Sequence, residues 1–207
     1  GSMNMTSPIM QDAAVRKGIA MGINKDGFVK TLLDGHGVAA SGAFPDGFST
    51  FGGENVTAEA YDPEGAKAVL EEAGWVDSDG DGIREKDGVK LTVRWLTYPS
   101  RQELPLLAES AQASLKEIGI DVDINCTANR REFLADMGSW DIYASAMVTA
   151  PSGDPQYFFT SCCAPGMSYN FGAYDNPEVT ALIEQLSQEF DPAKRGEMAV
   201  TLQQMIL

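Results

Sequence analysis

The chain has few of the residues that bind metals or act as nucleophiles in enzymes. Its 207 residues include three cysteines and one histidine. No CxxC pair occurs, and no Cys/His set has the spacing of a zinc site. A Cys–His nucleophile would need His36, which lies between two glycines, to meet a distant cysteine. There is also no nucleophile elbow and no HExxH motif. We therefore expect no enzymatic activity.

Basic residues are also scarce. Fifteen Lys and Arg stand against 30 Asp and Glu, which gives a net charge of −15 at pH 7. Nucleic acids and anionic membrane surfaces are bound by basic clusters, so neither is an expected partner. The acidity serves either solubility or a bias toward cationic ligands. No apolar run approaches the ~18 residues of a membrane-spanning helix.

The length predicts one domain or one large lobe with a substantial core. Gly1, Ser2 and Met3 resemble a cloning scar. Residues 1–7 are therefore set aside from fold reasoning as scar and lead-in. Residues 8–207 are taken as one lobe.

Capping residues and apolar spacing predict the elements of the first third. Asp12 precedes a helix over 13–23, a second helix runs over 25–33, and Pro63 begins a third that ends near residue 73. Residues 35–60 contain six glycines and predict a long irregular loop. Such loops are usually functional or packed against a partner.

A β-α-β unit is predicted next. Residues 77–88 are typical of a turn-rich hairpin, and 89–96 alternate as a strand. The sequence from Ser100 to Glu103 has the form of a capping box before a helix that ends near residue 118. Residues 120–124 alternate strictly, so this second strand is expected to pair parallel to the first by a right-handed crossover.

The remaining pattern completes an α/β fold, with a mixed sheet flanked by helices. It predicts a short helix over 131–137, an interior strand over 140–148 and a loop over 150–175. Two further helices begin at Asn176-Pro177 and Asp191-Pro192.

Loops at the carboxyl ends of parallel strands bind ligands in open α/β sheets. The loops 97–101 and 149–157 qualify, and both open on one edge if their strands are parallel. Tyr98 and Tyr157 are candidate ligand-binding residues there, with a place in the core as the alternative for an aromatic side chain. Arg101 lies in a first helical turn, where the dipole disfavours a cation. It either meets a carboxylate of a ligand or pairs with Glu103 or Asp154.

An acidic segment suggests an alternative function, calcium binding. Asp77, Asp79 and Asp81 imitate the first ligands of an EF-hand loop, with Gly82 in the sixth position. The twelfth position is Gly88 instead of the bidentate Glu, so a hairpin turn is the favoured interpretation. A calcium-stabilised structural module built on 77–87 is the alternative function.

Seven short motifs occur along the chain in the order found in a known protein family. They are Val15–Lys25, Tyr61–Lys67, Ala73-Gly74-Trp75, Asp79–Arg84, Leu115–Val122, Trp140-Asp141-Ile142 and Gly153-Asp154-Pro155. Together they resemble the large ligand-binding lobe of the extracytoplasmic solute-binding proteins of ABC importers, family 5, the peptide- and nickel-binding group.

The resemblance implies a periplasmic-binding-protein-like lobe of type II that captures solute by closure against a second lobe. That second lobe and a C-terminal return segment are expected to lie outside this sequence. It also implies delivery of solute to a membrane ABC permease. The expected location is extracytoplasmic, either in the periplasm or as a membrane-anchored lipoprotein. No resident cofactor is expected.

The resemblance leaves two solute classes open, di- or oligopeptides and nickel as a chelate. Peptide binders hold the peptide ammonium with an Asp where this chain has Pro151. Asp154, three residues on, is either a further ligand residue or a helix cap. Pro151 and Ser152 lie in a segment that also resembles the corresponding loop of nickel binders. The loop 161–167 has no histidine, which puts direct histidine ligation in doubt.

The cysteines have open roles. In an extracytoplasmic protein Cys126 could pair with Cys162 or Cys163, while buried free thiols are equally compatible with the sequence. The vicinal thiols at 162–163 could contact a soft metal or be purely structural.

Overall fold

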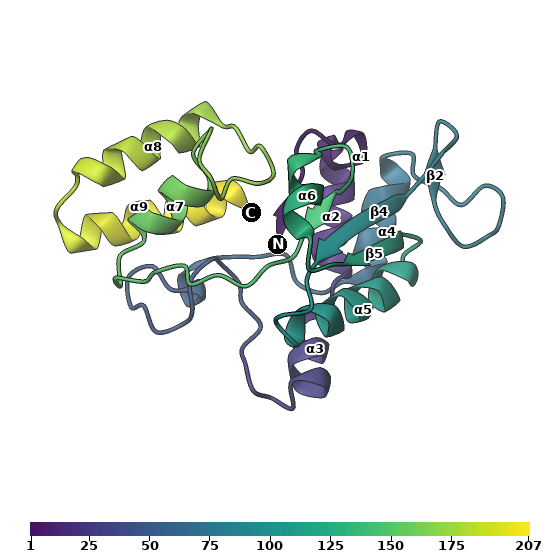
Figure 1. Cartoon of the computed structure of the whole chain (residues 1–207), viewed down its shortest axis with the longest axis horizontal. Coiled ribbons are helices and arrows are strands. Elements are labelled where there is room, and N and C mark those ends of the chain that lie inside the picture. The colour runs from purple at the N-terminus through teal and green to yellow at the C-terminus, as the bar shows by residue number, and fades with distance from the viewer. The chain divides into compact units, whose positions relative to one another are not determined.

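The computed structural model describes residues 1–207 and divides them into two compact units. Unit 1 comprises residues 1–38 and 59–146, and unit 2 comprises residues 39–58 and 147–207 (Figure 1). Sequence reasoning predicts a single lobe over 8–207 and does not anticipate this division. The segment 39–58 belongs to unit 2 because it packs on helices from the end of the chain.

Unit 1 contains a four-stranded mixed sheet. Its strands, in the order β1-β6-β4-β5, are β1 (Ser2–Met3), β6 (Ile142–Tyr143), β4 (Thr92–Thr97) and β5 (Asp121–Cys126). β4 is parallel to both β5 and β6, whereas β1 is antiparallel to β6. α5 (Glu103–Lys116) connects β4 to β5 (Figure 1). The predicted β-α-β unit and the mixed sheet are confirmed.

Three helices of unit 1 begin with a side-chain cap, and the cap at Asp12 is the one that the sequence predicts. Asp12 accepts a hydrogen bond from the Ala14 amide at the start of α2 (Ala13–Gly22). Asn24 and Asp62 cap α3 (Lys25–Leu32) and α4 (Pro63–Glu72) in the same way. α1 (Pro8–Gln11) and α6 (Arg130–Ala135) begin without a side-chain cap.

Glycines let the helices of unit 1 approach closely around one apolar core. A Cβ on Gly18 of α2 would lie 3.0 Å from Leu70 of α4, and a Cβ on Gly22 would lie 2.6 Å from Ile118. Larger residues would therefore separate these elements. The core includes Trp95 of β4 and Val122 of β5.

The predicted hairpin is confirmed: Val76 forms an antiparallel bridge with Glu85, and β2 (Glu85–Lys86) pairs with β3 (Val89–Lys90) around the two-residue turn of Asp87 and Gly88, both with positive φ. Two other local expectations are wrong. Ser100 does not cap α5, since it is exposed and Gln102 holds the N-cap position without a side-chain bond. The strand expected over 140–148 has ladder pairing only at β6.

Setting aside residues 1–7 is also wrong for the fold. Ser2 and Met3 form β1, because an edge strand needs only backbone groups to pair. Asn4 and Ser7 are buried. The Asn4 amide group donates to the Met137 and Trp140 carbonyls at 2.7 and 2.9 Å.

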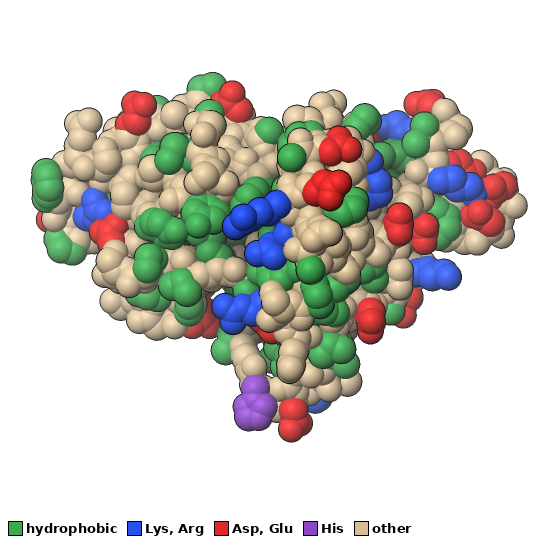
Figure 2. Space-filling model, viewed as in Figure 1, with side chains coloured by type: hydrophobic (Ala, Val, Ile, Leu, Met, Phe, Trp, Pro, Cys, Tyr) green, Lys and Arg blue, Asp and Glu red, His purple; other side chains and the backbone are tan.

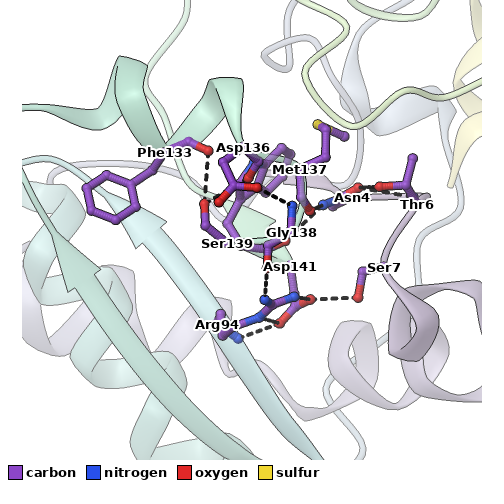
Figure 3. A network of polar contacts seen from close by, with 11 residues as sticks. Asn4, Thr6, Ser7, Arg94, Phe133, Asp136, Met137, Gly138, Ser139 and Asp141 are labelled. Atoms are coloured by element: carbon purple, nitrogen blue, oxygen red, sulfur yellow. Dashed lines mark hydrogen bonds and ion pairs between the residues drawn. The ribbon is translucent and has the colours of Figure 1, made fainter.

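A buried carboxylate joins this segment to the sheet (Figure 3). Asp141 is fully buried and accepts two side-chain hydrogen bonds from Arg94, at 2.8 and 2.6 Å. The Ser7 hydroxyl donates to it at 2.6 Å, and the Arg94 amide at 2.7 Å. Burial alone would raise the pKa of Asp141, but the bonds from Arg94 and Ser7 outweigh it and hold the pKa below its usual range.

Unit 2 is built from helices and the segment 39–58. Its helices are α7 (Gln156–Cys162), α8 (Pro177–Gln188) and α9 (Pro192–Ile206), with a 3₁₀ turn, η1, at Gly53–Asn55. Asn176 and Asp191 cap α8 and α9, as predicted. No helix in the structure has both the length and the apolar character needed to cross a bilayer.

Two glutamines hold the long irregular segment on α9. The buried Gln203 accepts from the Ala43 amide at 2.9 Å and donates to the Phe51 carbonyl at 2.9 Å. Gln204 makes the same pair of bonds with the backbone of Thr57, at 3.0 and 2.8 Å. Phe44 and Phe51 then enter the unit 2 core beside Phe159. The segment is thus packed, one of the two outcomes expected for such a loop.

We predict that Asp141→Ala lowers the free energy of unfolding by about 3 kcal/mol at pH 7, because it leaves Arg94 and Ser7 without their buried partner. The folded pKa is depressed, so this stabilisation is present above the ~3.9 of an unfolded Asp and is lost as the pH falls through the folded value. Urea unfolding between pH 2 and 7 tests both parts. Asp123→Asn, an exposed position on β5, is the control. An equal loss of unfolding free energy in Asp141→Ala and Asp123→Asn would contradict the prediction.

Candidate functional site

The carboxyl ends of β4 and β6 form one edge of the unit 1 sheet, because these neighbouring strands are parallel. Tyr98 directly follows β4 and is 7% exposed. Its hydroxyl accepts a hydrogen bond from the Ala146 amide at 3.2 Å. Its ring lies 6.3 Å from that of Tyr143, measured between centroids. Tyr98 is therefore a fixed and buried part of this edge, as in the core alternative considered for it, and its role in ligand binding stays a prediction.

An arginine not predicted from the sequence completes the cluster. The Arg130 guanidinium, at the start of α6, lies 4.1 Å from the centroid of the Tyr98 ring. It also bonds the Tyr143 hydroxyl. Burial raises the pKa of Tyr143, and the Arg130 charge offsets this only in part, so the phenol stays neutral at pH 7. The three side chains Tyr98, Tyr143 and Arg130 are called the Arg130 cluster below.

The residues after β5 line a shallow hollow of about 560 Å³. The lining runs from Ala128 to Glu132 and includes Arg130 and Arg131. Two adjacent cations in the first turn of α6 oppose its dipole. With two arginines against Glu132, the lining of the hollow carries a net positive charge in a strongly acidic protein.

Arg101 does not form the pairs considered for it. It is exposed, lies two residues before α5 instead of in its first turn, and makes no ion pair with Glu103. Asp154 is paired with Arg195 instead. The structure thus leaves Arg101 available without testing its role as a ligand residue.

Asp154 is a structural residue of unit 2. Its carboxylate accepts from the Gln156 amide at 2.8 Å, at the start of α7, and binds Arg195 through both oxygens at 2.8 and 2.7 Å. Arg195 also donates to the Leu186 and Glu189 carbonyls. Pro155, not Asp154, holds the N-cap position of α7, so Asp154 supports the start of this helix from one residue before the cap. Its carboxylate is occupied by Arg195.

The other candidates of this loop are exposed. Pro151 and Ser152 lie in the turn before Asp154, and Tyr157 of α7 is 38% exposed. None of them is held by a side-chain hydrogen bond. They belong to unit 2, whereas Tyr98 and Arg101 belong to unit 1. Their roles in ligand binding stay predictions.

The acidic loop already holds a cation of its own. The Lys90 ammonium lies 2.7 Å from Asp79 and 2.5 Å from Asp81, and these bonds raise its pKa. Asp77 accepts from the Gly80 and Gly82 amides. Figure 2 shows acidic and basic side chains together around the loop that carries β2. Oxygens of Asp77, Asp79 and Glu85 lie within 4.8 Å of one another, but Lys90 and backbone amides satisfy most of this group.

The three cysteines are free. Cys126 is exposed at the end of β5, Cys162 is half-buried and Cys163 is buried. Neither disulfide that the sequence allows is formed.

We predict that chelation leaves the melting temperature unchanged, because Lys90 rather than a divalent ion neutralises the acidic loop. The measurement is thermal unfolding in 5 mM EDTA against 5 mM CaCl₂. A calcium-dependent rise in melting temperature that disappears in Asp79→Asn would support the calcium-module alternative.

We predict that Asp154→Ala lowers the free energy of unfolding by about 1–2 kcal/mol, from the lost hydrogen bond to the Gln156 amide and the lost, partly exposed ion pair with Arg195. Arg195→Ala should cost at least as much, because it also removes two bonds to backbone carbonyls. Urea unfolding measures both. A variant at Asp154 with unchanged stability would show that this carboxylate has no structural role.

Known proteins similar to this chain identify its family. The family model for bacterial extracellular solute-binding proteins, family 5 Middle, matches residues 1–170. The nickel-binding protein NikA of Staphylococcus aureus is 26% identical over 186 residues, which cover 90% of this chain and 35% of the relative. The oligopeptide-binding protein OppA of Mycobacterium tuberculosis is 30% identical over 212 residues, covering 96% and 34%. The chain thus spans about a third of the length of these relatives.

Solved structures share the fold. A nickel ABC transporter structure from Bacillus halodurans superposes with a TM-score of 0.87 at 29% identity, covering 99% of this chain and 42% of that one. NikA of Staphylococcus aureus in complex with Ni(L-His)₂ gives 0.87 at 24%, covering 99% and 41%. The fold is that of the type II periplasmic binding proteins, and the chain belongs to the family 5 bacterial extracellular solute-binding proteins.

Proposed function

We propose that this chain supplies part of the solute site of an ABC import system, and that its Arg130 cluster binds a carboxylate of the solute. The observation that carries the proposal is the position of Arg130. Its guanidinium is stacked on Tyr98 and bonded to Tyr143, at the sheet edge where α/β proteins bind ligands.

The chemistry of the cluster favours a carboxylate. A guanidinium presents a planar fork of donors that matches the two oxygens of a carboxylate. Stacking on Tyr98 holds this fork before a ligand arrives, so less side-chain entropy is lost on binding. The net charge of −15 would repel an anionic solute elsewhere on the surface. A local pair of arginines at residues 130 and 131 supplies the necessary attraction.

One carboxylate site serves both solute classes that the relatives suggest. Peptides end in a carboxylate, and the histidine ligands of the nickel complex named above carry one each. The only histidine of this chain, His36, is exposed in unit 1. The chain therefore offers few side chains for direct nickel ligation, which favours nickel bound as a chelate. We accordingly propose di- or oligopeptides or a nickel chelate as cargo.

The wider role follows that of the family. We propose that a second lobe of the same protein closes over the bound solute, and that the closed form docks on a membrane permease. We place the protein outside the cytoplasm, in the periplasm or as a lipoprotein on the membrane, and assign it binding without catalysis. A half-site alone loses much of its affinity, because enclosure supplies part of the binding energy.

We predict that Arg130→Ala weakens solute binding at least tenfold while thermal stability stays near wild type. Isothermal titration with Ni(L-His)₂ and with a tripeptide measures the effect, using the two-lobed protein where the isolated chain binds too weakly. Lys30→Ala, which removes an exposed charge of unit 1, is the matched control.

The form of the ligand sharpens the test. A tripeptide amidated at its C-terminus should bind more weakly than the free acid to the wild type, and equally to Arg130→Ala. An acid-to-amide difference that persists in the variant would place carboxylate recognition elsewhere. Binding unaffected by Arg130→Ala would contradict the proposal.

A further inference from the structure

Two sulfur atoms meet near the surface of unit 2. Cys162 is the last residue of α7, and its thiol donates to the Met147 sulfur at a Sγ–Sδ distance of 3.5 Å (α7 in Figure 1). Fifteen residues separate the two positions in sequence. Met147 is 38% exposed and Cys162 is half-buried, so small solutes can reach the pair from solvent.

Sulfur ligands of this kind select soft cations. Thiolate and thioether sulfurs bind Cu(I) well, whereas calcium and magnesium require oxygen. With metal–sulfur bonds of about 2.3 Å, sulfurs 3.5 Å apart would subtend an angle of ~100° at a shared ion. That angle suits a three- or four-coordinate ion, with the remaining positions open to solvent or to a small ligand.

We propose that Cys162 and Met147 together form a binding site for a soft, thiophilic cation of the Cu(I) class. The site belongs to unit 2 and is independent of the Arg130 cluster. It uses residues that the proposed solute site does not use.

The surroundings favour a cation. Unit 2 carries nine acidic residues, two basic residues and no histidine, so its field attracts cations and no imidazole competes for them. Cys163 packs in the apolar core of unit 2 at 4% exposure. The accessible thiol is therefore that of Cys162, and the vicinal pair does not act as one chelating group.

Binding is a proton-for-metal exchange. The Cys162 thiol gives up its proton to solvent, the sulfur lone pair forms the bond to the ion, and no electron is transferred. Burial raises the pKa of Cys162 to about 11, so the thiol is protonated at neutral pH and one proton is released for each ion bound. The titratable groups coupled to it are Cys163 and, through Cys163, Tyr174.

The test is an anaerobic competition for Cu(I) against the chromophoric chelator bicinchoninate, with the complete chain. We expect the wild type to withdraw one Cu(I), and Cys162→Ser and Met147→Leu each to weaken binding at least tenfold. Cys126→Ser removes the exposed thiol at the end of β5 and is the matched control, expected to bind as the wild type does.

Other outcomes overturn the proposal. Wild-type affinity in both Cys162→Ser and Met147→Leu would rule out the site, and loss of binding in Cys126→Ser would place the ion on that thiol instead. Full affinity in Met147→Leu alone would reduce the site to a single thiol, contrary to the two-sulfur geometry. Because Met147→Leu keeps the side-chain volume at an exposed position, it tests the proposal even if Cys162→Ser folds poorly. Solute binding in these variants should remain that of the wild type.

Discussion

The buried carboxylate of Asp141 is the interaction on which unit 1 depends. It joins the start of the chain through Ser7, the central strand β4 through Arg94, and the beginning of β6 through its own backbone. A charge without water must be compensated by hydrogen bonds, so these three segments can adopt only one arrangement around it. Tyr143 lies two residues after Asp141, so the contacts of Asp141 also fix the position of Tyr143. The proposed solute site therefore depends on a residue that is itself inaccessible to solute.

Arg94 extends the same constraint toward α6. Besides Asp141, its guanidinium bonds the Gly138 carbonyl, in the loop that connects α6 to β6. Asn4 holds the neighbouring Met137 carbonyl. These contacts fix the position of that loop and therefore of α6. Arg130, at the start of α6, is thereby held against Tyr98. The stacked guanidinium is positioned by buried polar contacts rather than by apolar packing of α6, which has no fully buried residue.

Local chemistry explains what the sequence predicts well and what it misses. Helices that begin with Asp or Asn, such as those after Asp12, Asp62 and Asn176, are predictable because the cap acts within three residues. The role of Ser2–Met3 in the sheet and the pairing of Asp154 with Arg195 depend on residues about 140 and 41 positions away, which no local pattern contains. Arg130 was missed because only its neighbours in space, Tyr98 and Tyr143, distinguish it from any exposed arginine.

The attachment of residues 39–58 to α9 has a consequence for biosynthesis. Gln203 and Gln204 hold backbone groups of a segment made about 150 residues earlier. At typical elongation rates that segment waits on the order of ten seconds for its partner helix. Until then Phe44 and Phe51 have no core to enter, and such exposed aromatic surface attracts chaperones or other chains. Unit 2 can therefore mature only after α9 has been synthesised, and until then its aromatic segment depends on other contacts to stay out of water.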